Sequence, residues 1–188
     1  MTQVLSHVIG FDDAPFRSEH RGDVPLVGAV FSHMRLEGVL TGKVRRDGVN
    51  STSRIEQMVT QSRFAPQLQA VLIQGIAVAG FNVIDIHALN QRLNLPVIVV
   101  SRKLPDMEAI KEALLNNVPG GRRKWQLIEQ AGPMELVAKV YIQRAGISLG
   151  TAEALIRSCA KNSHIPEPLR TAHLIAAGLV NSNSRQRV

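Results

Sequence analysis

The stretch QAVLIQGIAVAGFNVIDIHALNQRLNLPVIVVS, residues 69–101, holds two short apolar runs separated by an amphipathic segment. The runs at 69–75 and 95–101 do not alternate polar and apolar residues, which is typical of strands covered on both faces. Residues 81–94 carry apolar side chains at helical spacing. A strand, a helix and a second strand in this order predict two parallel strands joined by a right-handed crossover.

Three extended segments precede this unit, at residues 4–11, 24–31 and 36–44. Because only short polar stretches separate them, we expect an antiparallel meander. A helix is expected at 51–64, with Ser51 or Thr52 as its N-cap.

The remainder of the chain is predicted to be mostly helical. Helices are expected over residues 105–117, 122–132, 149–162 and 167–179, with one further strand over 138–146. A meander joined to strand–helix–strand units predicts an α/β fold: one mixed sheet with helices on both faces, the element order of the ribonuclease H-like fold. We expect a single domain over residues 1–180 and a flexible basic tail over 181–188.

Composition limits the classes of function. With 45% hydrophobic residues among 188, the chain fits a globular protein and does not fit a disordered one. The formal charge of +7 favours a polyanionic partner such as nucleic acid, with simple solubility as the alternative. No segment has the apolar length of a membrane span, and the N-terminus lacks a signal-peptide pattern. The single cysteine, Cys159, excludes an internal disulfide and indicates a reducing, cytoplasmic compartment.

Two adjacent acids, Asp12 and Asp13, follow the first apolar run. In the ribonuclease H-like fold the first strand lies beside the fourth, so Asp12 is expected next to Gln74 at the sheet edge where ligands bind. Carboxylates that meet there repel each other unless a cation such as Mg²⁺ lies between them. A turn that begins at the acids and leads into Pro15 is the structural alternative. Asp47 lies in a turn before the first expected helix. It too is either part of a cation site or a residue that the turn requires.

The segment PEPLRTAH, residues 166–173, places Arg170 and His173 three positions apart, on one helical face. An arginine and a histidine beside acids favour phosphate binding and proton transfer. Further contacts to a nucleic-acid backbone are expected from the basic residues Arg102, Lys103, Arg122, Arg123, Lys124 and Arg170.

Five motifs together resemble the endonuclease dU family over nearly the whole chain. In chain order they are VIGFDDAPF (8–16), LEGVLTGKVRRDGVNST (36–52), QGIAVAGFNVIDIHAL (74–89), LPVIVVSRKLPDMEAI (95–110) and PEPLRTAHLIAAG (166–178). That family is similar to endonuclease V, a ribonuclease H-like enzyme acting on deaminated bases in DNA or RNA. The resemblance implies metal-dependent cleavage of a phosphodiester near a deaminated base, with uracil as the named lesion.

The resemblance also assigns roles to residues. Asp12 matches the first-strand aspartate of the endonuclease V metal site, Asp47 matches the acid before the first helix, and His173 matches the late basic residue near the scissile phosphate. Gln74 stands where the fourth strand would carry an acid, and its neutral amide should weaken Mg²⁺ binding unless Asp13 compensates. The aromatic–proline wedge that endonuclease V inserts beside its lesion is missing ahead of Asp47, so base recognition must work differently.

The leading interpretation is a Mg²⁺- or Mn²⁺-dependent endonuclease acting on damaged DNA. Its expected catalytic residues are Asp12, Asp47 and His173, and its expected metal ligands are Asp12, Asp13, Asp47 and Gln74. One alternative is a non-catalytic nucleic-acid-binding module whose metal site has decayed, and another is a metal-dependent hydrolase of a small phosphorylated molecule. The sequence leaves open the choice between DNA and RNA, the oligomeric state, and which of Asp12 and Asp13 faces the metal.

Overall fold

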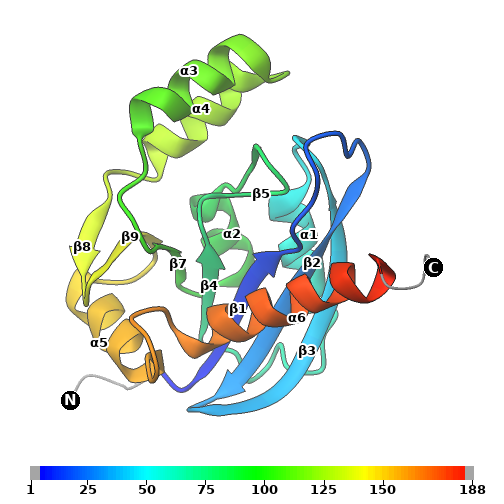
Figure 1. The fold of residues 1–188 in the computed structure, drawn as a ribbon. Coiled ribbons are helices and arrows are strands. Elements are labelled where there is room, and N and C mark those ends of the chain that lie inside the picture. Colours follow the sequence, from blue (N-terminus) through cyan, green and yellow to red (C-terminus); the bar gives the residue numbers. More distant parts are fainter. Residues whose placement is uncertain (1–4, 185–188) are drawn as a thin grey trace.

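The computed structural model describes residues 5–184, whose strands form one seven-stranded mixed sheet in the order β3-β2-β1-β4-β7-β9-β8 (Figure 1). The strands of this sheet are β1 (His7–Asp13), β2 (Asp23–Ser32), β3 (Arg35–Arg45), β4 (Ala70–Gln74), β7 (Val97–Ser101), β8 (Glu135–Val137) and β9 (Val140–Ala145). A separate two-stranded ladder consists of β5 (Ala77–Val78) and β6 (Asn82–Val83). The pairs β1–β4 and β4–β7 are parallel and the other pairs antiparallel, so the predicted mixed sheet, with its first strand beside its fourth, is confirmed.

Helices cover both faces of the sheet. They are α1 (Ser51–Thr60), α2 (Ile86–Leu93), α3 (Met107–Asn117), α4 (Gly121–Gln130), α5 (Leu149–Cys159) and α6 (Glu167–Ser184). In Figure 1, α6 crosses β1 and β2 on one face, and α1 and α2 lie behind the sheet. The predicted arrangement of helices on both faces is therefore confirmed.

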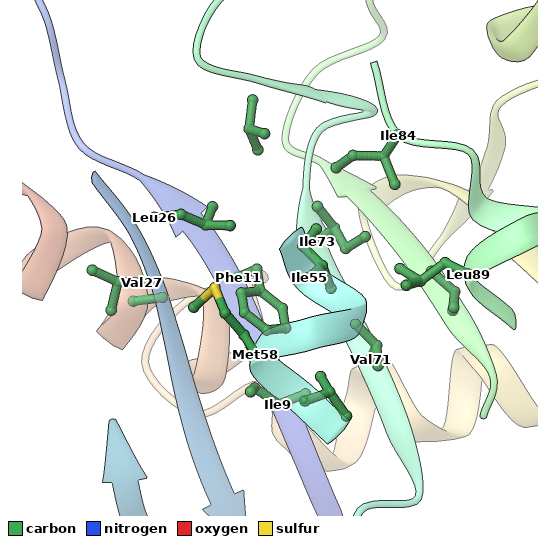
Figure 2. Close-up of a cluster of buried hydrophobic side chains, with 14 of the residues drawn as sticks. Ile9, Phe11, Leu26, Val27, Ile55, Met58, Val71, Ile73, Ile84 and Leu89 are labelled. Carbon is green, nitrogen blue, oxygen red and sulfur yellow. The ribbon is translucent and has the colours of Figure 1, made fainter. Parts of the chain in front are cut away.

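Alternate residues of the central strands enter two different apolar clusters, as a strand covered on both faces requires. Figure 2 shows Phe11, Val71 and Ile73 packed with Ile55 of α1 and Leu89 of α2. The intervening residues, such as Leu72 and Ile98, pack on the opposite side with residues of α5 and α6. This double burial explains the unbroken apolar runs in the sequence.

The helices α3 and α4 form a hairpin that extends from the body of the protein (Figure 1). Leu114 of α3 and Ile128 of α4 are buried together with Val83 at the base of this hairpin. The chain reverses at Gly120, whose φ of 70° favours glycine. The helices touch closely at the turn, because a Cβ on Gly121 would lie 1.7 Å from the carbonyl oxygen of Leu114.

The expected helix over residues 81–94 is shorter in the structure. The side chain of Asp85 accepts a hydrogen bond from the backbone N–H of Ala88 and caps α2, so the helix begins at Ile86. Residues 82 and 83 belong instead to the β5–β6 ladder. Strand β8 was not expected. It joins β9 through Ala138 and Lys139, which both have positive φ and carry no typical turn signal.

The closing helix α6 is longer than expected, because it continues to Ser184 and includes the first four residues of the predicted tail. The rest of that tail, 185–188, lies outside the described residues. Over the part of the chain that the structure describes, no helix has both the length and the apolar character to cross a membrane. The assignment of residues 1–180 to one domain stays a prediction.

Candidate active site at the carboxyl edge of the sheet

Three neighbouring parallel strands end at one edge of the sheet and place polar residues there. Asp12 and Asp13 end β1, Gln74 ends β4, and Arg102 follows β7 directly. The pairing of β1 with β4 and of β4 with β7 brings these residues together although they are distant in sequence. Open α/β sheets commonly bind ligands at this edge.

A pocket of about 600 Å³ opens at this edge. Its polar lining consists of Asp12, Asp13, Gln74, Arg102, Arg170 and His173, and its other lining residues are Ala14, Pro15, Phe16, Ile165 and Leu169. Gln74 supplies an amide to this lining. Arg102, Arg170 and His173 supply three groups able to contact phosphate. We call this cavity the Asp12 pocket.

Asp12 and Asp13 are held on different sides of β1, because consecutive strand residues alternate. The Oδ2 atom of Asp12 lies 2.8 Å from Nδ1 of His173 on α6. The Oδ2 atom of Asp13 accepts a hydrogen bond from the backbone N–H of Ala79, 2.9 Å away. Asp12 thus contacts α6, whereas Asp13 is hydrogen-bonded to the turn between β5 and β6, residues 79–81, and also lines the pocket.

The Asp12–His173 pair joins a buried acid to an accessible base. Asp12 is 6% exposed, whereas the side chain of His173 is 63% exposed. An ionised carboxylate only accepts hydrogen bonds, so Nδ1 of His173 carries the proton in this contact. Neutral His173 then presents Nε2 as a free acceptor, which is the arrangement of an imidazole acting as a general base.

The two carboxylates have unusual acidity. Burial, together with the negative charge of Asp13, raises the pKa of Asp12 from 3.8 to about 6, although the hydrogen bond from His173 opposes the shift. Burial also raises the pKa of Asp13. A buried acid and a partly buried neighbour, both with raised pKa values, form a place where a cation would be favourably bound.

A second ion pair holds Arg170 at the pocket. Glu167 begins α6, is 6% exposed, and accepts hydrogen bonds from Nε of Arg170 at 3.0 and 3.2 Å. Within residues 5–184, the terminal guanidinium nitrogens of Arg170 form no hydrogen bond to the protein. In the sequence, Glu167 is the first residue of the helix expected over residues 167–179, and no role at the site was predicted for it. Its spacing of three residues from an arginine on the same helix is the signal that could have identified it as a support for that arginine.

Asp47 lies at the same edge of the sheet, but it is not among the residues that line the Asp12 pocket. Its Oδ1 atom accepts a hydrogen bond from the N–H of Phe81 at 2.8 Å, and its Oδ2 atom lies 3.2 Å from Nε of Arg46. Its backbone N–H donates to the carbonyl oxygen of Ala79. The carboxylate of Asp47 is therefore engaged by Phe81 and Arg46 outside the lining of the Asp12 pocket, and its expected part in a metal site stays a prediction.

A buried polar network fixes the turn that carries Asp47. Asn82 is fully buried, and its amide donates to the carbonyl oxygen of Arg45 and to the side chain of Asn50 at 2.8 Å each. Its Oδ1 atom accepts from the N–H of Ser51. Sequence reasoning missed Asn82, because residues 81–94 carry the apolar spacing of a helix.

Most of the predicted basic contacts are exposed. Arg102 borders the Asp12 pocket and Lys103 follows it in the same loop. Arg122 and Arg123 are exposed at the start of α4, on the projecting α3–α4 hairpin. These four side chains are available to an anionic partner.

Lys124 does not have the surface position expected of a phosphate contact. It is 3% exposed, and its ammonium group donates to the carbonyl oxygen of Asp47 at 2.5 Å. Burial lowers the pKa of Lys124, and the charge of Asp47 opposes that shift. Lys124 therefore joins the α3–α4 hairpin to the Asp47 turn.

The donor set of the Asp12 pocket fits a partly hydrated magnesium site. Among the described residues, no three His, Cys, Asp or Glu side chains are grouped closely enough to hold a metal ion. Mg²⁺ does not need such a cage, because it keeps several waters and often binds one or two carboxylates plus a substrate phosphate. The buried carboxylate of Asp12, the partly buried carboxylate of Asp13 and the amide oxygen of Gln74 are hard oxygen donors of this kind.

Comparison with known proteins gives consistent results. The family model for endonuclease dU matches residues 5–180. A UPF0215 protein of Deinococcus radiodurans is 55% identical over 185 residues, which cover 98% of this chain and 94% of the relative. A protein of unknown function from Archaeoglobus fulgidus, whose crystal structure is known, has a TM-score of 0.86 and 31% identity over 93% of this chain and 98% of that one.

The same fold occurs in endonuclease V. The Ciona intestinalis enzyme, solved with a 24mer DNA that contains an inosine followed by a ribo-adenosine, has a TM-score of 0.61 and 16% identity. The match covers 95% of this chain and 87% of the Ciona chain. The prediction of a ribonuclease H-like fold is thereby confirmed.

Proposed function

The chain belongs to the endonuclease dU family, and from this membership we propose that it is a metal-dependent endonuclease that cleaves a phosphodiester bond near uracil in DNA. Family and fold support the broader statement, a nuclease acting on DNA. Uracil is proposed because the matched family is that of endonuclease dU. Inosine, in the DNA bound by the Ciona enzyme, is likewise a deaminated nucleoside. A cut near such a base would serve DNA repair, and we place it in the cytoplasm.

The observation that carries the proposal is the contact between buried Asp12 and exposed His173 inside a pocket that also presents Arg102 and Arg170. Asp12 would orient the imidazole, so that Nε2 can accept a proton from a water that attacks the phosphate. Arg170, held by Glu167, would bind phosphate oxygens through its free terminal nitrogens. These are the groups that phosphodiester hydrolysis needs.

Asp12, Asp13 and Gln74 are the proposed ligands of Mg²⁺ or Mn²⁺. When bound, such an ion would neutralise phosphate charge and supply water with a lowered pKa. Asp47 is proposed to act indirectly, through Arg46 and the turn between β5 and β6. Lys103, Arg122 and Arg123 would contact the DNA backbone further from the cut.

A non-catalytic nucleic-acid-binding module is the second candidate. Gln74 favours it, since a neutral amide occupies the end of β4. The scarcity of clustered acids among the described residues also favours it. This candidate predicts salt-sensitive binding without turnover.

Cleavage assays separate the two candidates. End-labelled oligonucleotides that contain one uracil, one hypoxanthine or only normal bases are incubated with Mg²⁺, with Mn²⁺ or with chelator. The endonuclease proposal expects metal-dependent products at a fixed distance from the deaminated base, and their absence with every substrate and metal leaves only the binding module. A small phosphodiester, added as competitor, tests hydrolysis of small molecules.

A further inference from the structure

A second pocket adjoins the Asp12 pocket and has no role in the chemistry described so far. Its volume is about 690 Å³, and residues of the β1–β2 connection and the end of α6 line it. We propose that this cavity, the Phe16 pocket, holds a nucleobase of the strand whose phosphate occupies the Asp12 pocket. The inference rests on the proposed nuclease function and adds the site that selects the base.

The two pockets share a wall. Pro15 and Phe16 line both of them, and only Ala14 separates these two residues from Asp12 and Asp13 in the chain. In a nucleotide, one sugar separates the base from its phosphate. A strand with a phosphate at Asp12 can therefore turn a neighbouring base across this wall, if that base has left the helical stack.

Phe16 is held in place as a stacking surface. Its side chain is half-buried against the core, and the guanidinium carbon of Arg46 lies 5.4 Å from the centre of its ring. Arg46 also donates hydrogen bonds to the carbonyl oxygens of Ser18 and His20, which fixes the connecting segment. An aromatic ring with restricted motion gives a base a stacking partner at a low entropic cost.

Hydrogen-bond acceptors lie near the ring of Phe16. The Nε2 atom of His20 lies 3.0 Å from the carbonyl oxygen of Asp23, so Nε2 carries the proton and Nδ1 of the neutral ring is an acceptor. Asp23, whose Oδ1 atom lies 3.8 Å from a guanidinium nitrogen of Arg45, is also a lining residue of the pocket. Deamination converts the acceptor nitrogen on the pairing edge of cytosine or adenine into an N–H donor. Acceptors beside Phe16 thus fit the group that distinguishes uracil from cytosine and hypoxanthine from adenine.

A fluorescent reporter tests stacking without cleavage. Phe16→Trp is combined with Trp125→Phe, so that the only indole stands in the pocket. Single strands that carry one uracil, or an abasic site in its place, are added in the presence of chelator. We expect the uracil strand to quench the emission at saturation and the abasic strand to leave most of it. Equal quenching by both strands would overturn the inference.

Affinity measurements supply the control. Phe16→Leu is expected to weaken binding of the uracil strand by about 5-fold to 150-fold, the usual effect of losing one base–aromatic stack, and to leave the abasic strand unchanged. Phe64→Leu is the matched variant, because Phe64 is also partly buried and has its own arginine contact but lines neither pocket. His20→Phe is expected to remove any preference for uracil over cytosine. An unchanged ratio of the affinities for the two strands would show that His20 does not recognise the base.

The two proposals fail in different ways. If the protein cuts no substrate but the emission of the Phe16→Trp reporter still separates uracil from abasic strands, the nuclease function fails and the base pocket stands. If the protein cuts uracil-containing DNA while the Phe16→Leu variant binds and cuts as before, only the base pocket fails. Thermal unfolding of each variant confirms that the compared proteins are folded.

Discussion

The Nδ1 atom of His173 and the Oδ2 atom of Asp12 lie 2.8 Å apart although 161 positions separate the two residues. The contact joins the last helix to the first strand at the edge where β1 and β4 end. The buried carboxylate of Asp12 lies beside the partly buried carboxylate of Asp13. The imidazole of His173 is the neighbouring group that can carry positive charge. The consequences for stability and for catalysis can be measured separately.

The raised pKa of Asp12 predicts how stability changes with pH. Between pH 3.8 and about 6 the unfolded chain has lost this proton and the native protein keeps it. The free energy of unfolding therefore falls as pH rises through this range, by up to roughly 3 kcal/mol. Asp12→Asn removes the titration, so the metal-free variant should be more stable than the natural protein at pH 7.5 and similar to it at pH 3.5. Thermal unfolding with chelator at both pH values measures this, with each kcal/mol worth about 2–4 °C.

A lower stability of Asp12→Asn at pH 7.5 would contradict burial as the dominant influence on this carboxylate. The same variant should lose cleavage altogether. A protein that becomes more stable and inactive through one substitution is what a functional site under electrostatic strain predicts.

Substitutions of Asp12 and of Asp47 are expected to affect metal binding differently. Asp12→Asn should abolish Mn²⁺ binding, whereas Asp47→Asn should retain it and lose about 1–3 kcal/mol of stability, because the hydrogen bond from Phe81 and the pairing with Arg46 are weakened. Calorimetric titration with Mn²⁺ and denaturant unfolding supply the two measurements. An equal loss of Mn²⁺ affinity in Asp47→Asn would identify Asp47 as a direct ligand.

Substitution of Gln74 distinguishes an active metal site that uses an amide ligand from a metal site that has decayed. Gln74→Asp adds the anion that the end of β4 lacks and should strengthen Mg²⁺ binding. If the natural site is active, cleavage at saturating Mg²⁺ should change little or fall, because a third carboxylate adds repulsion beside Asp12 and Asp13. Gln74→Ala is the control for loss of the amide. A large gain of cleavage in Gln74→Asp would instead support the decayed site.

Local patterns in the sequence predicted the central strands, because burial on both faces leaves an unbroken apolar run. They did not predict β8, since Ala138 and Lys139 make its turn with positive φ and without glycine or asparagine. At the site, strand order together with the family resemblance placed Asp12 near Gln74 and drew attention to His173. The burial of Lys124 depends on the docking of α4 against a turn 77 positions earlier, and no local pattern encodes such a contact.

The close contact between β1 and α6 predicts a strong effect at Gly10. A Cβ there would lie 2.5 Å from the carbonyl carbon of Pro168 and 2.7 Å from the backbone nitrogen of Leu169. Because these are backbone atoms, Gly10→Ala must displace the start of α6, the helix that carries Arg170 and His173. We expect a loss of about 2–4 kcal/mol in unfolding free energy and at least a tenfold loss of cleavage.

Gly178→Ala is the matched control on the same helix, since a Cβ at Gly178 meets no atom within 4 Å. It should raise stability by about 0.5–1 kcal/mol through helix propensity and leave cleavage unchanged. Denaturant unfolding of both variants measures the contrast. A Gly10→Ala protein with natural stability would show that α6 is not fixed against β1 in solution.

The exposed arginines of the α3–α4 hairpin should contribute affinity without selectivity. Arg122→Gln combined with Arg123→Gln removes two charges from the projecting hairpin and should lower the slope of log affinity against log salt by up to about 2, equally for uracil-containing and normal DNA. Arg35→Gln is the control, because Arg35 is 80% exposed at the opposite edge of the sheet and should leave the slope unchanged. Fluorescence anisotropy at several salt concentrations measures these slopes. A double variant with a changed preference for uracil and an unchanged salt slope would contradict this prediction. The hairpin would then recognise the base and would not contact the backbone.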